Sequence, residues 1–431
     1  MIRIILVLFC IFSLSFQLSK PKVSLTPAKS TISSTSHFAA TSYFEVSTVT
    51  YEDLTLENAQ YLGSVTLGGS SSEYPMVFDT TTANVWVFAA DCDKCEAITS
   101  EDATLFTCLS PCSYMGDYED NEETYTVNGL VDQHNFNIST YKAYDTVTLG
   151  GLAATSVPFY IVEDTTASHY SGLGAIGLRN SENNILKYYY SQGKISNQIF
   201  AFYFSSQYNL LTFGYEEPYF GMEDYETYEV IDGTLAWAIP LTSVEINGIA
   251  NNTYLPENLN SQFDSTLQGF GVPQSIYANF VYEIQKALGV TISYSQDIGI
   301  TATCSNKTNL QTLPTIGLVF GSSDRVFTFN PSDYAKYKNG TCHIPIFTDD
   351  HLTTWVLGIP FLKAYYVVFD MDNQEIKIAT KNTETSESWS QNEGLRIAVI
   401  VTGVVVAVMA VVMMLMIFKN VPVGSAPEKA D

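Results

Sequence analysis

Hydrophobic and polar residues alternate along most of the chain, which is the pattern of half-buried strands. The alternation begins at Tyr61–Gly68 and ends at Ile376–Ala379. Further strands are predicted at 74–78, 84–88, 144–149, 157–162, 200–204, 210–213, 237–241, 243–246, 315–320, 326–329, 355–357 and 365–369. Helices are predicted at Ile185–Ser191 and at Gln274–Leu288, where apolar residues recur at every fourth position. The pattern therefore predicts an all-β fold, and the 13% aromatic content agrees with it.

Two longer apolar runs lie at the ends of the chain. Residues 1–18 combine Arg3 with a short apolar run, which is typical of a secretory signal peptide. The residues from Ile397 to Phe418 are uncharged and long enough to cross a bilayer, so one transmembrane helix is predicted there. The signal and the span together place the body in the lumen of the secretory or endolysosomal pathway or outside the cell. Residues 419–431 then form a short cytosolic tail.

Changes in composition divide the rest of the chain. An acidic, tyrosine-rich stretch at 215–235 marks the crossing between two strand-rich halves. The predicted segments are a Ser/Thr-rich linker or pro-segment at 19–55, an N-terminal β lobe at 56–235, a C-terminal β lobe at 236–380 and a polar stalk at 381–396.

The net charge is −25 with only 20 Lys and Arg residues, which excludes a basic nucleic-acid-binding surface.

Cysteines and glycosylation sequons support a secretory protein. Six cysteines remain after the signal peptide, and an even number in a secreted chain indicates disulfides. They are Cys92, Cys95, Cys108, Cys112, Cys304 and Cys342. The first four also have the spacing of a zinc site, but an oxidising lumen favours disulfides. The sequons lie at Asn137, Asn251, Asn306 and Asn339.

One short motif occurs twice. Residues 78–82 read Phe-Asp-Thr-Thr-Thr, and residues 263–266 read Phe-Asp-Ser-Thr. Each follows an apolar strand, and a glycine in an apolar segment comes at nearly the same distance after each, at Gly174 and at Gly358. The repeat predicts two related lobes that each contribute one carboxylate.

With these motifs in place, residues from about 55 to 380 resemble the pepsin-like aspartic proteases. Residues 79–86 are similar to the family's first active-site turn, Asp-Thr-Gly-Ser-Ser-Asn-Leu-Trp. Residues 355–370 are similar to the family's Trp-Ile-Leu-Gly-x-x-Phe-Leu-Arg-x-Tyr-Tyr-x-Val-Phe-Asp. The resemblance implies a bilobal all-β fold with a pseudo-twofold axis. It also implies that Asp79 and Asp264 are a catalytic pair that shares one proton.

The resemblance implies supporting roles for other residues. Thr80 and Ser265 would reach across and brace the two facing loops, while Thr82 and Trp86 would support the first of them. Tyr125 is the candidate for the tyrosine that the family places over its cleft, with an ordinary loop tyrosine as the alternative.

Four positions near the expected site depart from the family pattern. Thr81 and Thr266 stand where the family has glycine, and a β-branched side chain there is expected to crowd the floor of the cleft. Leu267 replaces a hydroxyl residue, which is expected to remove a donor to Asp264. Ala175 falls where the first apolar-apolar-Gly segment would have its glycine.

The resemblance also bears on the disulfides. It implies the pair Cys304–Cys342 within the second lobe. The four remaining cysteines are expected to pair among themselves, nested as Cys92–Cys112 and Cys95–Cys108.

Two functions are consistent with these residues. The first is a membrane-anchored aspartic endopeptidase, expected to be a monomer that acts on peptides or proteins without a metal or other cofactor. The alternative is a catalytically inactive homologue whose cleft binds peptides or a protein partner. The departures at Thr81, Thr266 and Leu267 separate the two hypotheses.

Overall fold

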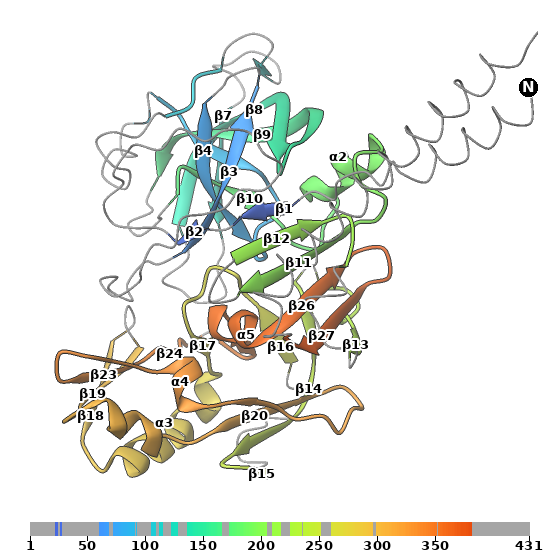
Figure 1. Ribbon diagram of the computed structural model, residues 1–431. Coiled ribbons are helices and arrows are strands. Elements are labelled where there is room, and N and C mark those ends of the chain that lie inside the picture. The colour runs from blue at the N-terminus through green and yellow to red at the C-terminus, as the bar shows by residue number, and fades with distance from the viewer. Residues whose placement is uncertain are drawn as a thin grey trace, which may run out of the picture. The chain divides into compact units, whose positions relative to one another are not determined.

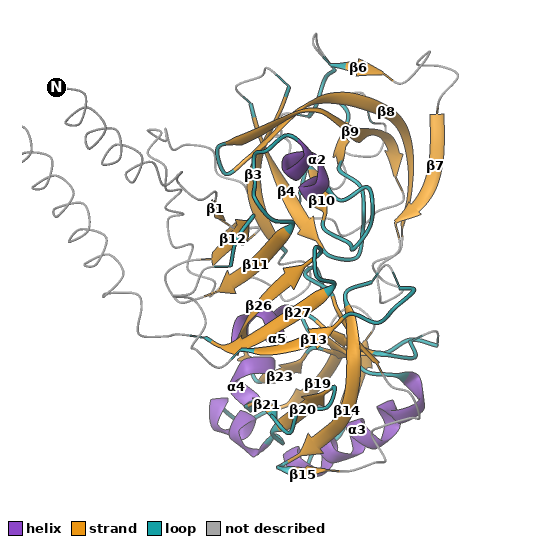
Figure 2. Ribbon diagram, turned by 90° about the vertical axis from the view of Figure 1, so that its right-hand side faces the viewer, coloured by secondary structure: helices purple, strands orange, loops and turns teal. Residues whose placement is uncertain are grey.

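A computed structural model of the chain describes residues 22–24, 26–27, 60–68, 72–90, 92, 105–108, 112–114, 122–127, 136–165, 172–204, 209–216, 225–234, 236–250, 260–295, 299–350 and 352–381. Strands dominate this part of the chain, and the all-β prediction is confirmed (Figure 2). The predicted signal peptide, membrane span and tail lie outside the described residues. Within those residues, no helix has the length and apolar character needed to cross a membrane.

The N-terminal half forms a nine-stranded sheet, drawn mainly in blue and cyan in Figure 1. Its strands are β2 (Thr26–Pro27), β3 (Tyr61–Leu67), β4 (Glu73–Asp79), β5 (Trp86–Phe88), β6 (Ser113–Tyr114), β7 (Glu122–Val127), β8 (Phe136–Leu149), β9 (Leu152–Thr165) and β10 (Gly174–Gly177). The predicted alternation is visible in β3, where Val65 and Leu67 are buried and Thr66 between them is half-buried. The short helix α2 (Ile185–Ser191) follows, and Asn184 caps it by accepting the Leu186 N–H.

The C-terminal half contains an eight-stranded and a four-stranded sheet. The larger sheet contains β14 (Ala238–Ile246), β15 (Ile249–Ala250), β16 (Asn260–Phe263), β17 (Phe270–Gly271), β20 (Ile316–Phe320), β21 (Phe327–Phe329), β24 (Ile346–Phe347) and β25 (Trp355–Leu357). The smaller contains β18 (Ile292–Ser295), β19 (Gly299–Thr303), β22 (Lys336–Lys338) and β23 (Thr341–Ile344). The two strands predicted at 237–241 and 243–246 form one strand, β14, whose register shifts between Leu241 and Ser243.

Helices in this half pack beside the sheets. Their bounds are α3 (Gln274–Leu288), the 3₁₀ helix η6 (Lys307–Thr312), α4 (Pro331–Tyr334) and α5 (Ile359–Ala364). Helix α3 has the predicted bounds and buries Ile276, Phe280 and Ile284 on one face. It ends at Gly289, whose left-handed backbone suits glycine because the residue has no Cβ.

A six-stranded sheet joins the two halves. Its strands are β1 (Lys22–Ser24), β11 (Ile199–Phe204), β12 (Asn209–Phe213), β13 (Glu226–Glu229), β26 (Tyr365–Asp370) and β27 (Glu375–Thr380). In Figure 1 it lies between the strands of the two halves. Strand β11 pairs with β26 across the boundary. Part of the segment predicted as a linker or pro-segment is also ordered here, because residues 22–24 pair with 210–212.

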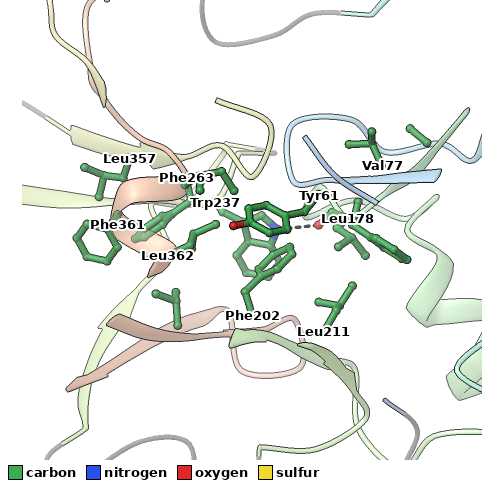
Figure 3. Close-up of a cluster of buried hydrophobic side chains, with 14 of the residues drawn as sticks. Tyr61, Val77, Leu178, Phe202, Leu211, Trp237, Phe263, Leu357, Phe361 and Leu362 are labelled. Atoms are coloured by element: carbon green, nitrogen blue, oxygen red, sulfur yellow. Dashed lines mark hydrogen bonds between the residues drawn. The ribbon is translucent and has the colours of Figure 1, made fainter. Parts of the chain in front are cut away.

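Aromatic side chains pack against one face of this sheet (Figure 3). The rings of Phe200 and Phe369 stack with centroids 4.7 Å apart. Trp237 is fully buried against both rings, and its indole N–H donates to the Leu178 carbonyl oxygen at 2.7 Å. Because Trp237 and Leu178 come from different halves, this hydrogen bond ties one half to the other.

The two halves repeat one strand arrangement. In the first, β10 lies between β4 and β5, parallel to β4 and antiparallel to β5. In the second, β25 lies in the same way between β16 and β17. Ile176 pairs with Phe78 as Leu357 pairs with Phe263. The repeat predicted from the sequence is therefore present.

This register corrects one sequence assignment. Since Ile176 corresponds to Leu357, the counterpart of Gly358 is Gly177, not Gly174. A Cβ on Gly177 would come within 2.4 Å of the Ala83 backbone, and a Cβ on Gly358 would come within 2.2 Å of the Leu267 carbonyl oxygen. Both glycines are required by close backbone contact, and the supposed departure at Ala175 was wrong.

The disulfides confirm one prediction and overturn another. Cys304 and Cys342 are bonded, as the family resemblance implied. Cys108 is bonded to Cys112, so both predicted nested pairs, Cys92–Cys112 and Cys95–Cys108, were wrong. The two bonded cysteines lie only four positions apart, and their spacing alone does not distinguish this pair from the nested ones. Cys92 also forms a disulfide, while Cys95 lies outside the described residues.

The sequons occupy several settings. Asn306 and Asn339 are exposed, at the start of η6 and in the turn between β22 and β23. Asn137 lies on β8, opposite Thr126. Asn251 lies outside the described residues. Glycosylation at these positions stays a prediction.

Candidate active site

The two motif aspartates occupy equivalent places in the repeat. Asp79 is the last residue of β4, and Asp264 directly follows β16. Asp79 is 4% exposed and Asp264 is completely buried. We refer to residues 79–82 as the Asp79 turn and to residues 264–267 as the Asp264 turn.

Thr80 and Ser265 connect the two turns across the halves. The Thr80 N–H donates to Ser265 Oγ, and the Ser265 N–H donates to Thr80 Oγ1, each at 3.0 Å. Thr80 Oγ1 donates to the Phe263 carbonyl oxygen at 3.0 Å, and Ser265 Oγ donates to the Phe78 carbonyl oxygen at 2.6 Å. These four bonds are reciprocal, and they hold the residues next to the two aspartates face to face.

The threonines in the glycine positions contact the aspartates directly. The backbone N–H and the hydroxyl of Thr81 both donate to Asp79 Oδ1 at 2.7 Å. In the Asp264 turn, the Thr266 N–H donates to Asp264 Oδ1 at 2.8 Å and its hydroxyl at 2.6 Å. Thr81 is 7% exposed and Thr266 is 6% exposed. Each hydroxyl therefore turns back onto its own aspartate, and the expected crowding of the cleft floor stays a prediction.

The next residues differ between the turns. The Leu267 N–H donates to Asp264 Oδ1 at 3.1 Å, so this oxygen receives three hydrogen bonds. The donor that Leu267 was expected to remove is supplied by the Thr266 hydroxyl instead. In the Asp79 turn, the buried Thr82 hydroxyl has no hydrogen-bond partner among the described residues, and the Thr82 carbonyl accepts the Arg179 N–H at 2.8 Å.

Arg179 is a residue of the site that the sequence did not reveal. The preceding residue, Leu178, donates its N–H to the Asp79 carbonyl oxygen at 2.7 Å, which places Arg179 beside the Asp79 turn. Partial burial lowers the pKa of the Arg179 guanidinium, and the negative charge of Asp79 opposes this shift. Its position two residues after Gly177, the glycine of the apolar-apolar-Gly segment, is the only signal for it in the sequence.

Two further predicted residues lie away from these contacts. Trp86 is a core residue of β5, which packs edge-on against Phe88 and pairs with Ala175 of β10. Tyr125 lies on β7 opposite Ile138 of β8, in a pair of antiparallel strands. Its role as a flap residue stays a prediction. Among the described residues, no group of three His, Cys, Asp or Glu side chains is placed to hold a metal ion.

Comparisons with known proteins place this arrangement in a class. Residues 60–381 of the chain match the family model described as eukaryotic aspartyl protease. The match covers both halves and both aspartate turns. The chain therefore belongs to the eukaryotic aspartyl protease family, and the fold inferred from the motifs is confirmed.

Individual relatives are distant. The chain is 27% identical to pepsin B of Canis lupus familiaris, over 79% of this chain and 86% of that protein. It is 22% identical to gastricsin of Callithrix jacchus, over 77% and 84% of the two chains. It is 26% identical to plasmepsin I of Plasmodium falciparum, over 75% and 69%.

Proposed function

We propose that this protein is an aspartic endopeptidase whose catalytic pair is Asp79 and Asp264. The observation that carries the proposal is the reciprocal set of bonds between Thr80 and Ser265, since it fixes two buried aspartates in facing turns. We expect the facing turns to bring the two carboxyl groups close enough that both cannot ionise easily, so that they share one proton. Membership of the aspartyl protease family supports the same reaction.

The proposed reaction needs only these groups, a water molecule and a peptide. The ionised carboxylate accepts a proton from the water as its oxygen attacks the carbonyl carbon of the scissile bond. The protonated carboxyl donates its proton to the carbonyl oxygen, which gives a neutral tetrahedral intermediate. The intermediate then collapses: the C–N bond breaks, the leaving nitrogen takes up a proton from the protonated carboxyl, and one hydroxyl of the intermediate gives its proton to the ionised carboxylate as the C=O bond forms again. Because protons only move between these groups, both carboxyls must keep a fixed orientation.

The proposed setting is a membrane-anchored body on the lumenal or extracellular side. It rests on the apolar run Ile397–Phe418 and on the signal-like residues 1–18. Carbonate extraction and protease protection of microsomes that contain the full-length protein test it. We expect the protein to stay in the membrane pellet and the body to be protected. Release of the full-length protein by carbonate would contradict the anchor.

Activity is tested with the full-length protein and a broad peptide library between pH 3 and pH 7, with and without a statine-type inhibitor. We expect cleavage in acid that the inhibitor blocks and that Asp264→Asn abolishes, because an amide cannot share the proton. Asp324→Asn, at an exposed position, is the matched control and should cleave normally. If the unaltered protein is folded and binds the inhibitor but cleaves nothing, the endopeptidase proposal fails and the binding alternative stands.

A further inference from the structure

Two threonine hydroxyls bond the carboxylates that the proposed reaction uses. Thr81 and Thr266 stand two residues after Asp79 and Asp264, and each hydroxyl donates to the same oxygen, Oδ1, as its own backbone N–H. The arrangement is repeated in both turns, so it follows from the shared backbone path and is not an accident of one loop.

Threonine suits this position for physical reasons. Neither residue has a positive φ, so a Cβ is tolerated without backbone strain. A β-branched side chain has few χ1 rotamers, and burial restricts them further, which fixes the direction of the hydroxyl. A hydroxyl that donates to a carboxylate stabilises its ionised form more than its protonated form.

We propose that Thr81 and Thr266 are positioning residues that clamp the two aspartates through Oδ1 and favour their ionised forms. The proposal rests on the proposed function, because its consequence is an extension of activity to lower pH. With both Oδ1 atoms held by fixed donors, the orientation of each carboxyl group is set.

The charged groups around the turns are few. On the described segments that hydrogen-bond to them, Arg179 stands beside Asp79. Strand β4 carries Glu73 and Tyr74 at its opposite end, and α5 carries Lys363, which is exposed. Strands β10, β16 and β25 carry no titratable side chain. The threonine hydroxyls and Arg179 are therefore the groups expected to set the pH range of the pair.

The test compares isosteric and conservative replacements in the full-length protein. Thr81→Val and Thr266→Val remove the hydroxyl and keep the shape, whereas Thr81→Ser and Thr266→Ser keep the hydroxyl. The readout is kcat/KM between pH 2.5 and pH 7. We expect each valine variant to move the acid limb of the profile upward by about one pH unit, because one charge-assisted hydrogen bond is lost. The serine variants should restore the limb to within about 0.3 unit of the unaltered protein, on the same physical ground.

Two controls separate positioning from general damage. Thr212→Val removes another fully buried hydroxyl, one with no hydrogen-bond partner in the described part of the chain, and should leave the profile unchanged. The double variant Thr81→Gly with Thr266→Gly keeps both backbone donors but loses both hydroxyls, so its acid limb should also move upward. Valine variants that lose rate at all pH values without moving the limb would overturn the proposal. A glycine double variant that works faster at low pH would overturn it too.

The proposal can fail separately from the proposed function. If the unaltered protein does not cleave peptides, the pH dependence of statine-type inhibitor binding replaces kcat/KM as the readout. A pH dependence of inhibitor binding that shifts in the valine variants and returns to its original position in the serine variants would then support the clamp in a protein that is not a protease. Binding curves that coincide for all variants would overturn the clamp.

Discussion

The Asp79 turn and the Asp264 turn receive the same hydrogen bonds from the same positions but differ in their surroundings. Each is braced by a hydroxyl of the other half, and each aspartate takes two donors from the threonine two residues later. Asp264 takes a further donor from Leu267 and is completely buried. Asp79 is slightly exposed and has Arg179 beside it.

This difference shows how a duplicated site becomes unequal without losing its geometry. The backbone path and the hydroxyl positions are repeated, because both turns must meet at one pseudo-twofold axis. The groups outside that path, Leu267 on one side and Arg179 on the other, are free to differ. The symmetric contacts therefore position both carboxyls, and the asymmetric contacts are expected to make their responses to pH differ.

The largest expected effect comes from removing either carboxyl. If the turns are equivalent in the chemistry, Asp79→Asn and Asp264→Asn should each lower kcat by at least about 10³-fold, since both proton-transfer roles need a carboxyl. The measurement is single-turnover cleavage at the optimum pH, with inhibitor-binding and melting curves to verify the fold. A variant of one turn that kept a tenth of the activity would show that only the other aspartate is essential.

The second-largest effect is expected from losing the hydrogen bonds between Thr80 and Ser265, and it should be the same for both residues. Thr80→Ala leaves the Ser265 N–H without its acceptor, and Ser265→Ala leaves the Thr80 N–H without its acceptor. We expect each to destabilise the fold by about 2–4 kcal/mol and to lower kcat by about 10²-fold, because buried donors lose partners and the turns move apart. Thermal unfolding and cleavage assays check both values. A large difference in stability or kcat between the two variants would show that Thr80 and Ser265 do not contribute equally.

A smaller effect is expected at the junction beside the Asp79 turn. Trp237→Phe keeps an aromatic ring between Phe200 and Phe369 but removes the donor to the Leu178 carbonyl. The cost should be about 1–3 kcal/mol, the price of one buried acceptor left unsatisfied. Chemical denaturation measures it, with Trp237→Leu as a comparison that also loses the ring contacts. An unchanged midpoint for Trp237→Phe would mean that this bond adds nothing to the junction.

Replacement of Arg179 should give the smallest effect, a shift in the pH dependence of kcat/KM. An arginine stays protonated throughout the acidic range, so its charge favours an ionised Asp79. Removing it by Arg179→Gln should move the acid limb of kcat/KM upward by about 0.5–1 unit, and added salt should reduce the difference. Arg179→Lys should preserve most of the effect. A limb that stayed in place in Arg179→Gln would show that this charge does not act on the pair.

Local patterns explain what could be predicted from the sequence. Helix α3 was predicted with its observed bounds because apolar residues recur along one face. The aspartate turns were found because each follows an apolar strand and carries the same residue types. In both cases, neighbours in sequence decide the structure.

What could not be predicted depends on contacts between distant segments. The register that makes Gly177 the counterpart of Gly358 follows from how β10 pairs with β4, and this pairing also brings Arg179 beside the Asp79 turn. Strand β1 pairs with β12, about 190 residues later in the chain, and no local pattern in the sequence indicates that partner.

The most direct test of the paired turns is a crystal structure of the full-length protein with a statine-type inhibitor. The account predicts that the inhibitor hydroxyl lies between the carboxyl groups of Asp79 and Asp264 and accepts and donates a hydrogen bond there. The hydroxyls of Thr81 and Thr266 should remain on Oδ1 of each aspartate. Carboxyl groups more than about 6 Å apart, too far to share a proton, would contradict it.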